Sequence, residues 1–265
     1  MGHVKLKASK EIKIDFNPKE LDNIEVPEES KKIAIDYLTS KKLVDEQQFD
    51  ILLLYEDKVL FGFDYLHNKV KRLVVEINPV TIFYSNAVMS YGMLNHYKDI
   101  LLSQSPDMRQ IEKAPAMNLT HCGMYFQLAI NCIINLQATL ESFANRIIPE
   151  DYPYLDKNGE PVVRTITYKL YNVLPKVKSM DFHLKKHKKH NISIDKLINL
   201  RNHIIHLKPT GETNTGYKGV YRDLMDFDYA KAILSVKTFV NFYEPSLIEE
   251  CACGKDFYFD SGQKI

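Results

Sequence analysis

Three polar residues at a fixed spacing form the part of this sequence that is best suited to chemistry. They are Arg201, Asn202 and His206. On a helix, Asn202 and His206 share a face, and Arg201 lies about 140° around the axis from His206. An arginine keeps its charge, an amide can orient a neighbour, and an imidazole titrates near neutral pH. These groups can hold a phosphodiester and move a proton beside it.

Cleavage of RNA by its own 2′-hydroxyl is the reaction that these groups suit. It needs a base for the 2′-hydroxyl proton, an acid for the 5′-oxygen and a cation for the charged phosphorane. We predict that His206 transfers protons, Arg201 grips phosphate oxygens, and Asn202 orients His206 or the phosphate. We expect no metal ion and no cofactor, because no carboxylates show ligand spacing. His203 is a candidate substrate-binding residue, with helix capping or packing as the alternative.

A basic stretch before these residues is a candidate for contact with phosphates. Its lysines and histidines are Lys185, Lys186, Lys188, Lys189, His183, His187 and His190. The histidine spacing would suit a metal on a helix, but the interleaved lysines repel a dication. We therefore predict that the four lysines bind substrate, with a solvated polar loop as the alternative.

Length and composition are those of an ordinary globular chain. The sequence has 265 residues, of which 45% are hydrophobic and 26% charged, and a formal net charge of +1. Any attraction for nucleic acid must therefore be local. No apolar run approaches the roughly 20 residues of a membrane span, so we expect a cytoplasmic protein with no membrane partner. Cys251 and Cys253 lack a second ligand pair, which favours reduced thiols over a zinc site.

Residues 1–110 are predicted to form a small mixed α/β region of unassigned role. Acidic residues after Pro27 favour a helix over about 27–43. Apolar runs at 50–55 and 59–63, joined by a short polar segment, predict a β-hairpin, and residues 71–77 predict a third strand. A further helix is expected over about 85–103. This region carries no catalytic motif.

Helical periodicity dominates the sequence after Pro115. We expect helices over about 118–148, 165–182, 193–207 and 228–243, with Ser193 as an N-cap. A hairpin-type turn is expected at 156–159 and a Gly-rich loop at 210–219. Four helices with a long first member predict a bundle over residues 115–246, followed by a tail at 247–265. The predicted fold class is α+β overall.

The C-terminal half of the chain resembles the HEPN family (higher eukaryotes and prokaryotes nucleotide-binding). Arg201, Asn202 and His206 match the family's ribonuclease motif of an arginine, a polar residue, three further residues and a histidine. Leu140, Glu141 and Phe143 resemble the Leu-Glu-aromatic segment of its first long helix. The resemblance covers about residues 119–243. It implies a HEPN-like four-helix bundle and a metal-independent endoribonuclease.

The resemblance also implies partners. HEPN ribonucleases usually form homodimers in which two motifs meet at one composite active site, and their products are a 2′,3′-cyclic phosphate and a 5′-hydroxyl. Many members are toxins or antiviral effectors, so RNA and an antitoxin or other regulatory partner are expected. Lys208 stands where members paired with a nucleotidyltransferase antitoxin often have a tyrosine, which argues against that particular pairing.

Two other functions stay open at this point. A HEPN-like module could bind a nucleotide, RNA or protein without cutting, or Arg201 and His206 could belong to a buried polar network. Glu141 either orients Arg201 or a histidine, or lies exposed. Tyr217 and Tyr221 either stack on a base or belong to the surface or core. An open cleft around Arg201 and His206 would favour the enzyme, and burial of both would favour the structural role.

Overall fold

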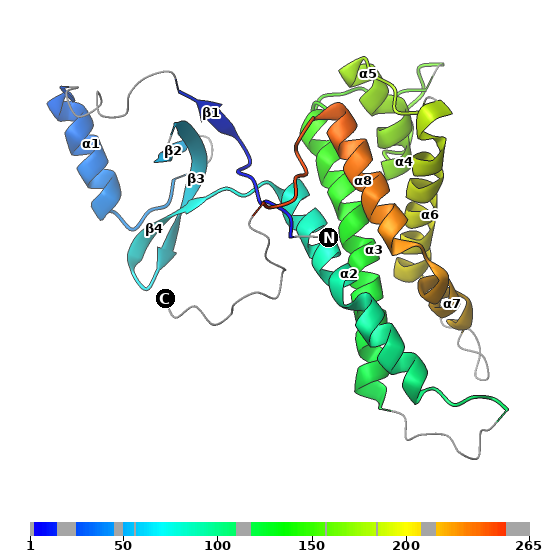
Figure 1. Cartoon of the computed structure of the whole chain (residues 1–265). Coiled ribbons are helices and arrows are strands. Elements are labelled where there is room, and N and C mark those ends of the chain that lie inside the picture. The colour runs from blue at the N-terminus through cyan, green and yellow to red at the C-terminus, as the bar shows by residue number, and fades with distance from the viewer. Residues whose placement is uncertain are drawn as a thin grey trace. The chain divides into compact units, whose positions relative to one another are not determined.

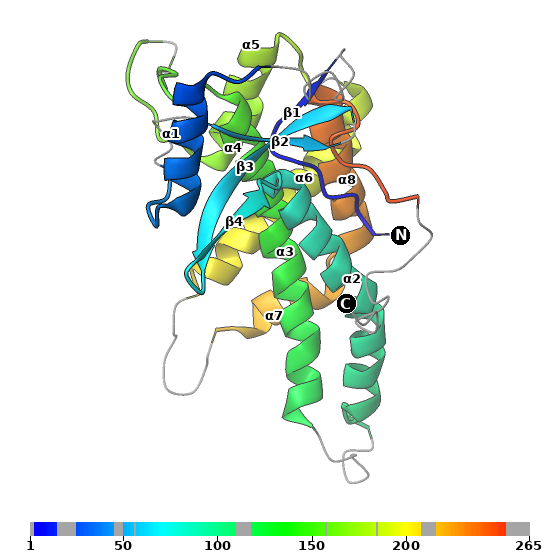
Figure 2. The same cartoon turned by 90° about the vertical axis from the view of Figure 1, so that its left-hand side faces the viewer.

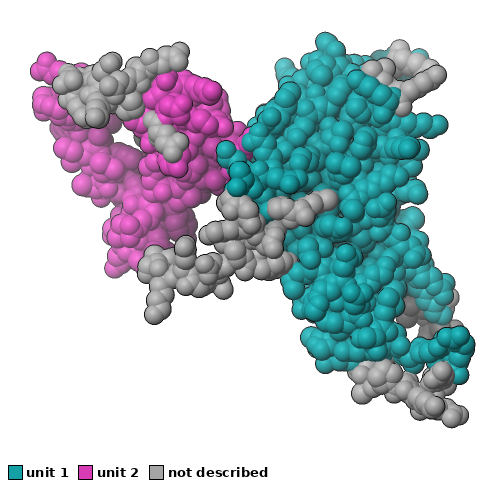
Figure 3. Space-filling model, in the orientation of Figure 1, with its two compact units in different colours: residues 1–5, 79–265 teal, residues 6–78 magenta. Residues whose placement is uncertain are grey.

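The computed structural model describes residues 3–14, 25–44, 50–55, 57–109, 118–156, 158–183, 185–207 and 216–252. The chain divides into two compact units (Figure 3). Residues 6–78 form the sheet unit, and residues 1–5 together with 79–265 form the helical unit. The fold is α+β, as predicted, with a small antiparallel sheet on the N-terminal side and a helical C-terminal region. Among the described residues, no helix has the length and apolar character needed to cross a membrane.

The described part of the sheet unit contains one helix and four antiparallel strands. Its elements are β1 (Glu11–Lys13), α1 (Glu28–Thr39), β2 (Ile51–Tyr55), β3 (Lys58–His67) and β4 (Val70–Val75) (Figure 1). The central strand is β3, which pairs with β1 and β2 through its first half and with β4 through its second. The tight turn before β4 uses positive φ angles at Asn68 and Lys69. The predicted hairpin and third strand are confirmed.

Polar contacts join α1 and the segment after it to the sheet. The Asp64 carboxylate accepts hydrogen bonds from the Tyr37 hydroxyl at 2.9 Å and from the Val44 N–H at 3.2 Å. The Lys71 Nζ lies 3.8 Å from the same carboxylate and donates to the Tyr37 carbonyl oxygen at 2.7 Å. Desolvation and the bond to Asp64 raise the pKa of Tyr37 to about 12. No apolar side chain is buried in the described part of this unit, so polar contacts secure α1.

In the part of the helical unit that the structure describes, four long helices form a bundle. They are α2 (Pro79–Gln104), α3 (Leu119–Ile147), α6 (Lys188–Ile205) and α8 (Tyr229–Tyr243). Figures 1 and 2 show α2 and α3 side by side along their lengths. Shorter elements are α4 (Ile166–Tyr168), a π-helical turn (Lys169–Val173), α5 (Leu174–Lys178), a 3₁₀ turn (Lys185–His187) and α7 (Lys218–Asp226). Large side chains from several helices fill the core, among them Tyr125, Phe143, Leu197 and Phe239.

The α2 helix belongs to the helical unit, so the division at residue 78 differs from the boundary expected near residue 110. Its Tyr84 hydroxyl donates to the Ile233 carbonyl oxygen of α8 at 3.2 Å. The Lys98 Nζ donates to the Met225 carbonyl oxygen of α7 at 2.7 Å. The helix also begins six residues earlier than expected, because Pro79 suits a first turn.

Other helix ends show which local signals were reliable. Asn118 and Asp228 cap α3 and α8 close to their expected starts. By contrast, α6 begins at Lys188, so Ser193 is a buried interior residue and its prediction as an N-cap was wrong. The helix predicted to reach residue 182 ends at Lys178, because Ser179 adopts a left-handed conformation with φ 51°. The α7 helix, which was not expected, follows a predicted loop that lies mainly outside the described residues.

Candidate functional site

The three predicted catalytic residues lie at the C-terminal end of α6. Arg201 and Asn202 are half-buried, and His206, which ends the helix, is exposed. The His206 N–H donates to the Asn202 carbonyl oxygen at 3.1 Å, so the last turn is helical up to the imidazole. The ring forms no hydrogen bond with any described residue. At the exposed end of α6, the imidazole is therefore not engaged by any side chain or backbone group in the described ranges.

Arg201 lies on a different flank of the same helix. Its position is about 140° around the axis from His206, beside the face on which Ile194 and Ile198 enter the core. Its Nη1 lies 3.4 Å from Oδ1 of Asn202, which is a long hydrogen bond. A single chain thus brings Arg201 to Asn202 but does not place Arg201 and His206 on one face of α6.

The half-buried Glu141 does not orient Arg201 through an ion pair. Its carboxylate forms no salt bridge with Arg201 or with any other described residue. The predicted alternative, in which Glu141 acts across the bundle on the motif arginine, therefore gains no support from the described contacts.

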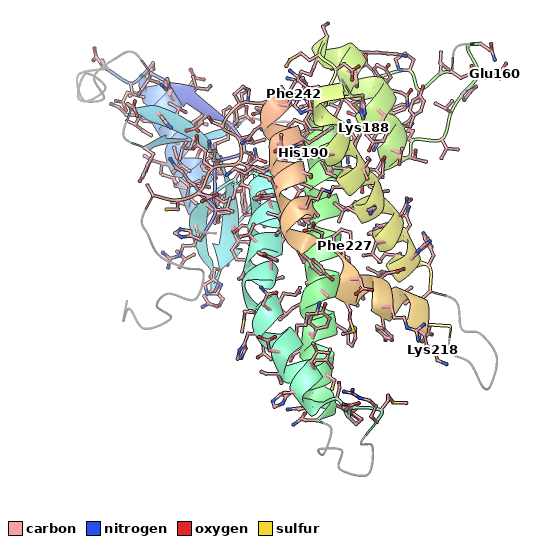
Figure 4. The ribbon with its side chains drawn as sticks, turned by 45° about the vertical axis from the view of Figure 1, so that its right-hand side comes forward. Glu160, Lys188, His190, Lys218, Phe227 and Phe242 are labelled. Atoms are coloured by element: carbon pink, nitrogen blue, oxygen red, sulfur yellow. The ribbon has the colours of Figure 1, made fainter. Side chains whose placement is uncertain are left out.

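A cavity of about 420 Å³ opens between α6, α7 and the first turn of α8. Its polar lining includes Asn199 and His203 from α6 and Asp223 and Asp226 from α7. Its apolar lining includes Leu200 and Phe227. Figure 4 shows Phe227 where α7 meets α8. Of the predicted site residues, His203 lines this cavity, whereas Arg201, Asn202 and His206 do not.

Two tyrosines hold the cavity wall that α7 forms. The Leu224 carbonyl oxygen accepts hydrogen bonds from the Tyr125 hydroxyl at 3.0 Å and from the Tyr229 hydroxyl at 2.6 Å. Helix geometry leaves the last carbonyl groups of α7 without intrahelical partners, and these bonds satisfy one of them. Desolvation raises the pKa of both phenols, so both stay protonated as donors. The buried Leu224 side chain anchors the same turn in the core.

Carboxylates outnumber ammonium groups in the cavity lining. Asp223, Asp226 and Asp228 lie with Lys196 and Lys231. The Asp228 Oδ1 caps α8 by accepting the Lys231 N–H at 3.0 Å. Asp223 and Asp226 form no side-chain hydrogen bond or ion pair with described residues, and their i, i+3 spacing makes them neighbours on α7. Two uncommitted carboxylates therefore share one wall.

The basic stretch lies at the other end of α6. Lys185 belongs to the 3₁₀ turn, and Lys188, which begins α6, is labelled at that end in Figure 4. Lys186, Lys188 and Lys189 are exposed. With 18 residues, α6 is about 27 Å long, which corresponds to about eight phosphates of a stacked strand. Within a single chain, this stretch is therefore separated from His206 by the length of α6.

The histidines of the basic stretch make packing contacts. His187 stacks on Phe182 with ring centroids 4.2 Å apart, and His183 meets Tyr171 edge-on at 4.1 Å. His190 shares a 3.1 Å hydrogen bond with a serine hydroxyl of α8. Desolvation lowers the pKa of His183 and of His187. Among the described residues, no group of three His, Cys, Asp or Glu side chains is placed to hold a metal.

The remaining candidates are now placed or lie outside the described residues. Tyr221 packs its ring 4.6 Å from that of Phe126 and lies 6.5 Å from that of Tyr217, which makes these side chains part of an aromatic surface contact. Cys251 is half-buried, and Cys253 with the rest of the tail lies outside the described residues. Lys208 also lies outside them.

Sequence reasoning missed the carboxylates of α7. Their i, i+3 spacing beside the apolar Leu224 was the available signal, but the segment is short and follows a Gly-rich stretch. Comparisons with protein-family models, curated proteins and solved structures gave no match to this chain. The candidate site consists of the exposed end of α6 and the adjoining cavity.

Proposed function

We propose that this protein is a metal-independent endoribonuclease of the HEPN type that acts in the cytoplasm as a toxin or anti-phage effector. The observation that carries the proposal is the position of His206. Its imidazole lies exposed at the end of α6 and is free of hydrogen bonds to described residues. A histidine kept for packing would stack on another ring or be hydrogen-bonded, as His187 and His190 are. An uncommitted imidazole at the surface suits proton transfer to and from RNA.

The flanks of α6 favour a shared active site. One imidazole does not easily serve as both base and acid, and a two-fold homodimer would supply a second. Arg201 lies on another flank from His206 within one protomer. In the dimer that we propose, the guanidinium beside His206 comes from the partner's Arg201. Asn202 precedes His206 by one turn and would orient the imidazole or a phosphate oxygen.

A second candidate is a binding module that cuts nothing. The cavity between α6 and α7 favours it, because a site of about 420 Å³ can hold a ligand without any contribution from His206. The two candidates differ in one respect: the module needs no imidazole at the end of α6.

Incubation of the purified chain with single-stranded RNA in EDTA tests the proposal. Wild-type protein should cut, and His206→Ala should lose about 10²–10⁴ in rate while its circular dichroism is unchanged, because the residue is exposed. The matched control is His96→Ala, which removes an exposed imidazole from α2. Cleavage by His206→Ala at the wild-type rate, or cleavage only with an added dication, would overturn the proposal. RNA binding without cleavage would favour the module.

A further inference from the structure

The cavity beside α6 is lined by a hydroxyl group that no described residue engages. Ser193 lines the cavity and is 5% exposed, and its hydroxyl forms no hydrogen bond with described residues. The buried Ser235 behaves differently, because its hydroxyl donates to the Lys231 carbonyl oxygen at 2.7 Å. The Ser193 hydroxyl is therefore available to a molecule that enters the cavity, as donor and as acceptor.

The charge of the cavity selects the part of an RNA strand that can enter. Three carboxylates face two ammonium groups, so a phosphate would meet net repulsion. A base is neutral and offers N–H donors, and each donor can bond to a carboxylate. The volume of about 420 Å³ lies within the range of sites that hold molecules of nucleoside size. The cavity therefore suits a base and excludes the backbone.

The two uncommitted carboxylates distinguish among the four bases. Guanine presents two adjacent donors, N1–H and the N2 amino group, which match the two oxygens of one carboxylate. Adenine and cytosine present one amino donor beside an acceptor, and uracil presents one donor between acceptors, so each would set a lone pair against Asp223 or Asp226. Unpaired bases are read on this edge in single-stranded RNA. The lining thus favours guanine.

Two further side chains complete the site. Phe227 is half-buried in the lining, and its ring is held edge-on by Tyr229 with centroids 5.1 Å apart, which offers a face for stacking. His203 lines the same cavity three residues before His206, a rise of about 4.5 Å along α6. A base in the cavity would therefore lie about one helical turn from the proposed proton-transfer group.

We infer that this cavity binds a guanine base of single-stranded RNA and so directs cleavage to a phosphate beside a guanine. This inference rests on the proposed function for its RNA substrate. The carboxylate of Asp223 or Asp226 receives the N1–H and N2 donors of the base, Ser193 bonds to a further polar atom, and Phe227 stacks on the ring.

Binding measured without cleavage tests the inference. The probes are 2′-O-methyl octamers of uridine in which one central nucleotide is guanosine, inosine, adenosine or cytidine. The 2′-O-methyl group removes the 2′-hydroxyl nucleophile, so these strands can be bound but not cut. Fluorescence anisotropy should show the guanine strand binding at least about tenfold more tightly than the inosine strand, which lacks the N2 amino donor. The double variant Asp223→Asn/Asp226→Asn should bind all four strands alike. The control Asp99→Asn, at an exposed site on α2, should keep the preference.

The outcomes separate this inference from the proposed function. Equal affinity of the wild type for the four strands would overturn the guanine site even if RNA is cut. A guanine preference without cleavage of the matching ribo-octamer would refute the nuclease and leave the site standing. Free guanosine binding as tightly as the guanine octamer would assign the site to a nucleoside and overturn its assignment to RNA.

Discussion

The hydroxyl of Tyr229 donates a 2.6 Å hydrogen bond to the carbonyl oxygen of Leu224. The two residues are five apart in sequence and belong to the start of α8 and the end of α7. Because Tyr125 of α3 donates to the same oxygen at 3.0 Å, one carbonyl group ties together three helices. The cavity wall that carries Asp223 and Asp226 therefore depends on this junction.

Removing both hydroxyl groups should destabilise the protein by more than the sum of the single changes. Tyr125→Phe or Tyr229→Phe alone leaves one donor and should lower the free energy of unfolding by about 0.5–1.5 kcal/mol. The double variant leaves the Leu224 carbonyl without a tyrosine donor, which adds a penalty of about 1–3 kcal/mol. Urea unfolding of all four proteins gives the coupling energy. Additive losses would show that Leu224 does not link the two tyrosines.

Much of this junction could not be predicted from the sequence. Helical periodicity is a local signal, and it placed the starts of α3 and α8 close to Asn118 and Asp228, whose side chains cap these helices. The burial of Ser193 and the pairing of α2 with α3 depend on contacts between distant segments, which neither spacing nor composition reveals. His203 was a candidate from its neighbours in sequence, yet its place in a cavity needed α7 and α8.

Stability should fall on acidification, partly through His183 and His187. Desolvation lowers the pKa of both below the ordinary value near 6.5. Their contribution to the free energy of unfolding is therefore fully present above about pH 6.5. It is lost as the pH falls through the lower folded-state pKa, because the unfolded chain then binds more protons than the folded chain. Urea unfolding from about pH 8 to about pH 5 should show a smaller loss for His187→Phe, which keeps a ring against Phe182. The exposed control His96→Asn should follow the wild type, and equal slopes for all three would contradict the assignment.

The lysines at the start of α6 should matter for long strands more than for short ones. Lys188→Gln/Lys189→Gln should weaken binding of single strands longer than about eight nucleotides and reduce the salt slope by about 0.7 for each lost phosphate contact. Strands too short to span α6 should be unaffected. Affinity measured over a salt series, with the exposed Lys32→Gln/Lys176→Gln as control, checks this. An unchanged slope would indicate that these lysines form a solvated face.

Two inactive variants should complement each other if the active site is shared. A mixed dimer of Arg201→Gln and His206→Ala can unite one intact arginine with the partner's intact histidine. Activity below a quarter of the wild type should then return after mixing, because half of the dimers are mixed, and each keeps one such pair but lacks the second imidazole. Sedimentation at the assay concentration verifies that a dimer is present. If a mixture shown to contain dimers recovers no activity, Arg201 and His206 act together within one protomer and not across the dimer.

The absence of buried apolar side chains in the described part of the sheet unit has a calorimetric consequence. Heat capacity rises on unfolding mainly because apolar surface meets water, and the described residues of this unit already expose Leu52, Leu54, Phe63 and Leu73. Its melting should therefore add less heat per residue, and a smaller step in the baseline, than the melting of the helical unit. A thermogram of the whole chain would mainly report the unfolding of the helical unit. Its midpoint would depend little on whether residues 6–78 are folded.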